Sequence, residues 1–164
     1  MKNLFKYLSM ILLIAICTSC ETEEGYADYP SENSPVVDLA GEWYVQTFVD
    51  GTIVTDYSLL TTSNTSSDDG SEIQIFDHKN IWWFKVKSPI NGLTFSGSDL
   101  ASDVDGYEIT VNINNGIIKK DGAKASNTNT IVDLISFDIE FSDEPGVIYH
   151  IEGFKRSGFL EDEH

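Results

Sequence analysis

Histidine, serine and carboxylate side chains are the groups in this sequence that could carry out hydrolysis. A triad of His150, a serine and an aspartate stays open, because chain order does not constrain the geometry of a triad. No G-x-S-x-G motif marks a nucleophile elbow at Ser98, Ser136 or Ser157, and no H-E-x-x-H motif marks a zinc protease. The sequence therefore predicts no catalytic residue, no metal and no cofactor, with an esterase-type hydrolase as an alternative.

The acidic turn Asp103–Glu108 (DVDGYE) carries half of the D-x-D-x-D-G pattern of a calcium-binding loop. In that frame the first ligand position is Ala101 and the twelfth is Asn112, so two of the principal ligands fail. The pattern therefore favours a turn with solvated carboxylates over a metal site.

The two cysteines, Cys17 and Cys20, both lie near the N-terminus, so the rest of the chain has no disulfide framework or cysteine nucleophile. Residues 1–19 carry two lysines and then an apolar run too short for a transmembrane helix, which indicates a secretory signal peptide. Ser19 before Cys20 resembles a bacterial lipobox, although Cys17 replaces its usual leucine. We expect acyl chains such as palmitate on Cys20 to anchor the protein to a membrane; an uncleaved anchor is the alternative.

The chain is strongly acidic, with a net charge of −17 from 10 basic and 27 acidic residues. Nucleic acid is not an expected partner, because its phosphates would be repelled. The acidic run Glu21–Glu24 resembles the surface-export signal of Bacteroidetes lipoproteins, so we expect an outer-membrane lipoprotein exposed at the cell surface. Residues 20–37 show no apolar period and are interpreted as a flexible acidic tether, which leaves 38–164 as the folded domain.

Beyond the tether, apolar and polar residues alternate with the period of two that is typical of β-strands. The clearest runs are Trp43–Val49, Tyr107–Asn114 and Ile135–Phe141. A further run, Ile81–Lys87, predicts another strand, and Asn115-Gly116 predicts a hairpin turn. About eight short strands with mostly short connections predict an all-β, antiparallel up-and-down barrel.

One face of these strands supplies the candidates for lining a ligand cavity. One of Trp82 and Trp83 must point inward, and we favour Trp82 because it shares a face with Phe84 and Val86. Packing of the core is the alternative role for this face. The full set of ligand-lining candidates is Trp82, Phe84, Val86, Tyr107, Ile109, Val111, Phe137 and Ile139.

The start of the domain, Asp38–Val45 (DLAGEWYV), resembles the G-x-W opening of lipocalins. In lipocalins this tryptophan closes the barrel floor, and an arginine from the last strand packs across its ring. The resemblance implies that Gly41, Trp43 and Arg156 form the floor of a lipocalin-like barrel. It also implies that the Arg156 guanidinium lies within about 6 Å of the Trp43 ring.

A narrower resemblance covers nearly the whole chain. After the acylated cysteine, five sequence blocks follow in a fixed order: AGEWYV, WFKVK, NGIIKKDGA, FDIEFSDEPG and GFKRSGFLEDE. In this order they resemble the lipid-binding putative hydrolases, which are small lipocalin-like lipoproteins of the Bacteroidetes. The resemblance implies a lipid-binding function, which the family name joins to hydrolysis.

We expect a monomeric, non-catalytic lipoprotein whose barrel holds a small apolar or amphipathic, lipid-like ligand. The alternative is a surface adaptor that binds a protein or a glycan through its loops, with a barrel filled by its own side chains. The barrel interior distinguishes the two, because a binding protein needs a cavity and an adaptor does not.

Overall fold

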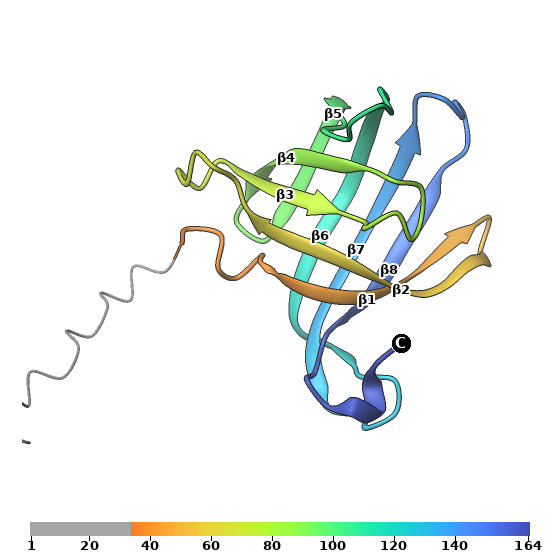
Figure 1. Cartoon of the computed structure of the whole chain (residues 1–164). Helices are drawn as coiled ribbons and strands as arrows, with labels where there is room; N and C mark the ends of the chain where they lie inside the picture. The colour runs from red at the N-terminus through yellow and green to blue at the C-terminus, as the bar shows by residue number, and fades with distance from the viewer. Residues whose placement is uncertain (1–33) are drawn as a thin grey trace, which may run out of the picture. The chain divides into compact units, whose positions relative to one another are not determined.

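The computed structural model describes residues 34–164, which form a closed antiparallel β-barrel (Figure 1). Each strand pairs with the next in sequence, and β8 pairs with β1 to close the barrel, as predicted. The elements are β1 (Gly41–Val49), β2 (Thr52–Asn64), β3 (Glu72–Phe76), β4 (Lys85–Asn91), β5 (Thr94–Ala101), β6 (Thr110–Lys124), β7 (Ile131–Phe141), β8 (Tyr149–Lys155) and the short 3₁₀-helix η2 (Leu160–Asp162). Within these residues, no helix has the length and apolar character needed to span a membrane.

Residues 1–33 lie outside the described residues. The predicted signal peptide (1–19), the acylation of Cys20 and the tether from residue 20 to residue 33 therefore stay predictions.

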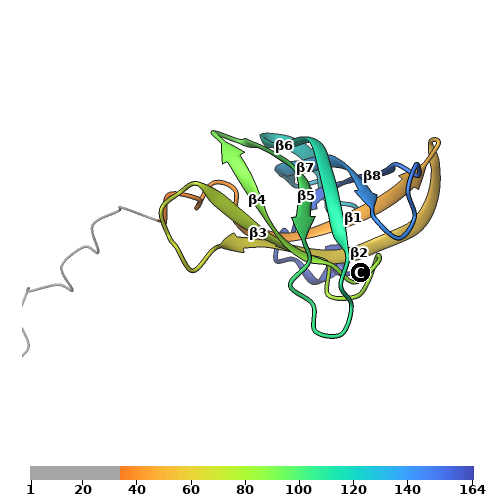
Figure 2. The same cartoon turned by 90° about the horizontal axis from the view of Figure 1, so that it is seen from above.

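The connections between strands lie alternately at the two ends of the barrel. The β1–β2, β3–β4, β5–β6 and β7–β8 connections share one end, which we call the mouth, and the other connections share the opposite end, which we call the base. Figure 2 shows the β1–β2 and β7–β8 hairpins projecting together, away from the β2–β3 connection. The mouth is made of residues 50–51, 77–84, 102–109 and 142–148.

Alternate strand residues point into the barrel and form one hydrophobic core. On β1, Trp43, Val45 and Thr47 are all buried, as their period-two spacing predicts. Complete burial of a large apolar side chain stabilises a fold by about 1.5–3 kcal/mol, so this core is the main source of stability. The largest fully buried side chains are Trp43, Phe84, Phe137, Phe141, Leu39, Leu60, Ile73, Ile75, Ile113, Ile118, Ile135 and Ile139.

A turn that precedes β1, Ser34–Ala40, packs against the base. Val36 is 0% exposed and Leu39 is 2% exposed, and both belong to the same core as Trp43. The Thr62 hydroxyl joins the two, because it donates to the Leu39 carbonyl (2.5 Å) and accepts from the Trp43 indole (2.8 Å). The predicted domain start at residue 38 is therefore too late, since the core already includes Val36.

The predicted hairpin at Asn115-Gly116 is wrong, because β6 runs through it without turning. A hairpin of this type needs positive φ at both residues, whereas only Asn115 (φ 55°) has it here. The two residues instead form a β-bulge, where the register against β7 shifts by one between Asn114 and Ile117. The extra residue lets both Ile113 and Gly116 face inward.

Two strands begin later than their apolar patterns predict. Residues 77–84 form an irregular mouth loop, and β4 starts only at Lys85. Pro89 lies inside β4 and does not end it. The Ile90 N–H donates to Ser71 on the β3 side, so the nitrogen of Pro89, which has no hydrogen to donate, faces away from β3. Similarly, Tyr107 and Ile109 precede β6 and belong to a mouth connection.

The hydrogen-bonded ladder between β4 and β5 is short. Their register contains two pairs, Ile90 with Phe95 and Asn91 with Thr94, both next to the turn at the base. Near the mouth, the Asp103 backbone N–H donates to the Lys85 carbonyl (2.7 Å), and this bond connects the start of β4 to the segment after β5. A pocket of about 430 Å³ lies in the wall along these two strands, with Lys87 and Leu100 among its lining residues.

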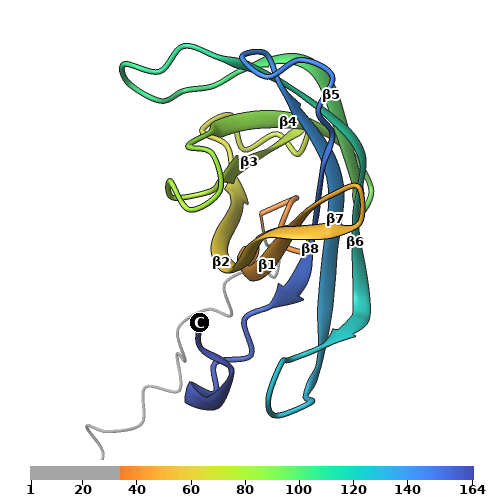
Figure 3. The same cartoon turned by 90° about the vertical axis from the view of Figure 1, so that its right-hand side faces the viewer.

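The segment after β8 folds back at the base (Figures 1 and 3). Asp162, in η2, is 1% exposed and accepts the backbone N–H groups of Asn127 (2.9 Å) and Thr128 (2.8 Å). It also accepts the hydroxyls of Thr128 (2.6 Å) and Ser157 (2.7 Å). Burial by itself would raise the Asp162 pKa, but these hydrogen bonds outweigh it and hold the pKa well below its usual range.

Candidate functional site

Most of the ligand-lining candidates lie in a packed core. Six of them are buried within a single hydrophobic cluster, while Trp82 and Tyr107 are partly buried and pack against it. Ring pairs such as Phe95 of β5 and Phe137 of β7 (5.5 Å between centroids) pack against each other inside the barrel. The six buried candidates are Phe84, Val86, Ile109, Val111, Phe137 and Ile139.

Above this packed core, the mouth contains a pocket of about 490 Å³. Its walls are mainly apolar, and Trp82 is the one residue of the predicted set that lines it. The strand ends and connections of the mouth supply the rest of the wall. The lining residues are Thr47, Val49, Val54, Thr55, Ile81, Trp82, Glu144, Val147 and Tyr149.

Trp82 forms an aromatic wall of the mouth pocket. Its ring stacks on Phe141 (4.8 Å between centroids, 12° between planes) and lies 5.4 Å from the ring of Tyr149. Its indole N–H donates to the Tyr107 hydroxyl (2.9 Å), which in turn donates to Asp143. These contacts hold the Trp82 ring in one orientation against the pocket.

The mouth loop that carries Trp82 is held by the buried carboxylate of Asp77, which is 0% exposed. Its two oxygens accept five backbone N–H groups of the same loop, from Lys79 to Phe84, at 2.7–3.3 Å. These five N–H groups stabilise the Asp77 carboxylate without a neighbouring cation in the described part of the chain. Trp83 takes a positive φ of 89° and stands with Lys79 Nζ over its ring (4.1 Å), away from the pocket lining.

Four of the lining residues bring polar groups to the mouth pocket: Thr47, Thr55, Glu144 and Tyr149. The Thr47 hydroxyl is buried and has no hydrogen-bond partner among the described residues. Glu144 accepts the Tyr149 hydroxyl at 2.5 Å. Burial, the hydrogen bond to Glu144 and the negative charge nearby raise the pKa of Tyr149 to about 12, so this hydroxyl keeps its proton at neutral pH.

His150 forms half of the arrangement that a triad requires. Its Nδ1 lies 2.8 Å from Asp138, but its Nε2 faces the Glu152 carboxylate at 3.8 Å. None of Ser98, Ser136 and Ser157 forms a hydrogen bond with His150, and the Ser157 hydroxyl donates to Asp162. Within the described residues, the structure therefore brings no serine to this histidine.

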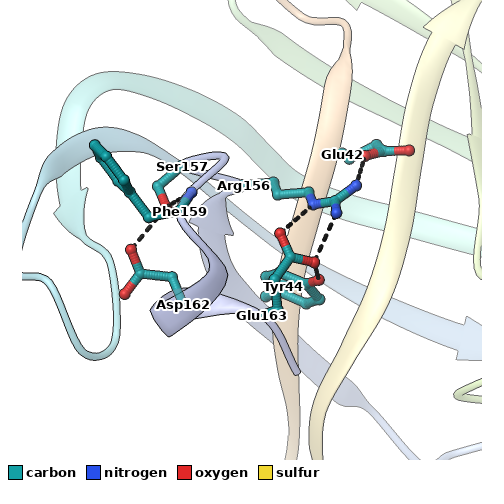
Figure 4. Close-up of polar contacts among 7 residues, drawn as sticks. All are labelled: Glu42, Tyr44, Arg156, Ser157, Phe159, Asp162 and Glu163. Carbon is teal, nitrogen blue, oxygen red and sulfur yellow. Dashed lines mark hydrogen bonds and ion pairs between the residues drawn. The ribbon is translucent and has the colours of Figure 1, made fainter.

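The predicted contact between Arg156 and Trp43 is wrong. Trp43 pairs with Lys155 across β1 and β8, and Lys155 Nζ lies 5.6 Å from the Trp43 ring centroid. Consecutive residues of a strand face opposite sides, so Arg156 points outward. There its guanidinium binds Glu42 (2.7 Å) and Glu163 (2.6 and 2.8 Å), as Figure 4 shows. The base thus keeps a cation over its tryptophan, but the cation belongs to the preceding residue.

Sequence reasoning missed most of the mouth pocket. Val147 lies in the β7–β8 connection and Tyr149 begins β8, while Thr47 and Val49 continue the inward face of β1 toward the mouth. The inward period of β1 could have identified the last two residues. Ile81 and Trp82 carry no comparable signal, because hydrogen bonds from their backbone N–H groups to Asp77 set their positions.

Comparison with curated proteins finds no match to this chain. The family model described as lipid-binding putative hydrolase matches residues 28–160, which spans the whole barrel and most of the chain. With its closed eight-stranded barrel and this match, the chain belongs to the family of lipid-binding putative hydrolases.

Proposed function

We propose that the protein reversibly binds a small apolar or amphipathic, lipid-like ligand in the mouth pocket, without a covalent step. The observation that carries this proposal is the pocket itself, about 490 Å³ with apolar walls around Trp82 and Tyr149. Its volume lies in the range of about 300–1,000 Å³ that is usual for small-molecule sites. Because the core below is packed, the ligand sits above it at the mouth.

Aliphatic and aromatic groups in the lining supply the driving force. Val49, Val54 and Val147 offer branched surfaces, and Trp82 offers a ring whose indole N–H is already bonded to Tyr107. Apolar surface removed from water contributes roughly 25 cal/mol per Å². Because the wall is already ordered, binding does not have to supply the entropy cost of ordering its side chains. This favours reversible binding of moderate affinity.

The site can be tested with N-phenyl-1-naphthylamine, a neutral apolar dye whose emission rises when it leaves water. We expect Trp82→Ala to weaken dye binding by roughly five- to tenfold, because an aromatic contact contributes about 1 kcal/mol. Trp83→Ala is the matched control and should leave the affinity nearly unchanged, since Trp83 does not line the pocket. Absence of dye binding by the wild-type protein, or equal losses in both variants, would contradict the proposal.

Membrane attachment through Cys20 forms part of the same proposal. Small Ser19 and an apolar run precede this cysteine, and the tether after it would hold the barrel near the membrane surface. We expect Cys20→Ala to move the protein from the membrane fraction to the soluble fraction, with Cys17→Ala as the control that stays on the membrane. Retention of the Cys20 variant on membranes would indicate an uncleaved signal peptide instead.

The adaptor alternative gains support from the packed core below the mouth. A barrel filled by Phe84, Phe137 and Phe141 needs no internal ligand for stability. The dye experiment separates the two functions, because an adaptor that acts through its loops would leave the mouth pocket without a small ligand.

A further inference from the structure

A buried hydroxyl without a partner marks the mouth pocket as the place for a polar group as well as an apolar one. Thr47 is 0% exposed, its Oγ1 has no hydrogen-bond partner among the described residues, and it lines the pocket. Buried polar atoms are normally hydrogen-bonded, so an orphan hydroxyl in a binding pocket points to a ligand atom that completes it. A threonine hydroxyl can accept as well as donate.

Glu144 brings a carboxylate to the same pocket. Its Oε2 accepts the Tyr149 hydroxyl, and no described residue donates to its Oε1. The Tyr149 hydroxyl keeps its proton at neutral pH, so Tyr149 is the donor in this hydrogen bond and Glu144 is the acceptor. Glu144 is half-buried, which reduces the screening of its charge by water.

The surroundings of the pocket carry the same sign of charge. The mouth connections contain the acidic residues Asp50, Asp103, Asp105, Glu108, Asp143 and Glu144 besides the buried Asp77. Their only lysine is Lys79, which lies over the outward Trp83 ring. Lys85, at the start of β4, pairs with Asp103 (3.9 Å). The field at the mouth therefore repels anions and attracts cations.

We infer that the mouth pocket selects an amphipath whose polar group is a protonated amine, and that it discriminates against fatty-acid carboxylates. An ammonium group could donate to Glu144 and to the Thr47 hydroxyl, while the faces of Trp82 and Tyr149 favour a cation. A carboxylate could accept from the Thr47 hydroxyl, but it offers no proton to Glu144 and is repelled by the charge of that side chain. This inference rests on the proposed function and names the class of ligand that it takes.

The test compares three ten-carbon probes at pH 7.5: decylamine and decanoate below their micelle concentrations, and decanol below its solubility limit. Titration calorimetry on the wild-type protein should show decylamine binding at least about tenfold more tightly than decanoate, with decanol between them. Glu144→Gln should remove most of that preference, because the amide can still accept from Tyr149 but carries no charge. Thr47→Val should weaken decylamine binding about threefold or more and leave binding of the neutral dye intact, since it removes only an unpartnered hydroxyl.

Glu108→Gln is the control for general attraction between a cationic probe and an acidic protein. It removes one charge from the mouth but does not line the pocket, so the ratio of decylamine to decanoate affinity should stay nearly unchanged. Equal affinities for the three probes, a preference for decanoate, or equal effects of Glu144→Gln and Glu108→Gln would overturn the inference and leave the proposed function standing if the dye still binds. Failure of the dye and of all three probes would overturn both.

Discussion

At the scale of single residues, the Asp77 carboxylate decides whether the mouth loop has a fixed shape. It is buried and accepts five backbone N–H groups within residues 79–84. We expect Asp77→Ala to lower the free energy of unfolding by about 3 kcal/mol or more, because it leaves several buried donors without an acceptor. Urea denaturation followed by far-ultraviolet circular dichroism gives the value.

Asp69→Ala is the matched control for Asp77→Ala. Asp69 also accepts a backbone N–H within its own turn, from Ser71 (2.9 Å), but it lies exposed in the β2–β3 connection. It should therefore change the unfolding midpoint much less. Similar losses in the two variants would show that Asp77 has no special role in the mouth.

The residues of the site differ in how visible they are in the sequence. The burial of Trp43 follows from the period of two along β1. Trp82 reaches the pocket from an irregular loop whose backbone Asp77 holds, so a strand period does not explain its position. The cation over Trp43 follows from the same period, because Lys155 and not Arg156 shares its face, but the lipocalin resemblance pointed to the neighbouring residue. The roles of Asp77 and of the Thr47 hydroxyl depend on distant neighbours, and so no local pattern reveals them.

At the scale of elements, the bulge at Asn115-Gly116 keeps both halves of β6 in register with the core. Gly116 faces inward opposite Phe95, and a Cβ atom there would lie 2.3 Å from the Phe95 carbonyl oxygen. We expect Gly116→Ala to destabilise the barrel by about 1–3 kcal/mol, because the two strands must move apart. Asn114→Ala, on the exposed face of the same bulge, should stay within about 0.5 kcal/mol of the wild type. Thermal unfolding of the three proteins tests this, and a neutral Gly116→Ala variant would refute the close approach.

The strands were easier to predict than their connections. The inward faces of β1 and β7 alternate as their sequences indicate, because one side of each strand must be buried. The hairpin prediction at Asn115-Gly116 failed because this dipeptide suits both a turn and a β-bulge. Only the pairing of β6 with both β5 and β7 decides between the two. The strand prediction for Ile81–Phe84 failed because these residues, although largely aromatic, belong to a loop.

At the scale of the whole molecule, the base depends on chain segments outside the eight strands. Asp162 connects η2 to the β6–β7 connection, and its pKa is held below the usual value of a carboxyl. A depressed pKa stabilises the fold above about pH 4, and that contribution is lost as the pH falls toward the folded pKa. We expect Asp162→Asn to lower the Tm at pH 7 by a few degrees, and the difference from wild type to shrink toward pH 2.

Scanning calorimetry at several pH values between 2 and 7 measures this difference. Asp105→Asn serves as the control, because Asp105 is exposed in the β5–β6 connection. It should follow the wild-type Tm at every pH. A constant Tm difference between Asp162→Asn and the wild type across the range would contradict the linkage.

The short ladder between β4 and β5 makes one seam of the barrel mechanically weaker than the others. Seven of the eight neighbouring strand pairs are joined by at least four register pairs, whereas this one has two, near the base. When the barrel opens transiently, β4 and β5 should separate first. Near the mouth, the hydrogen bond from the Asp103 backbone N–H to the Lys85 carbonyl holds these two strands together. The β3–β4 loop leads directly into Lys85, so parting of the seam would loosen the wall that carries Trp82. The same weak seam would then set how fast a ligand leaves the mouth pocket.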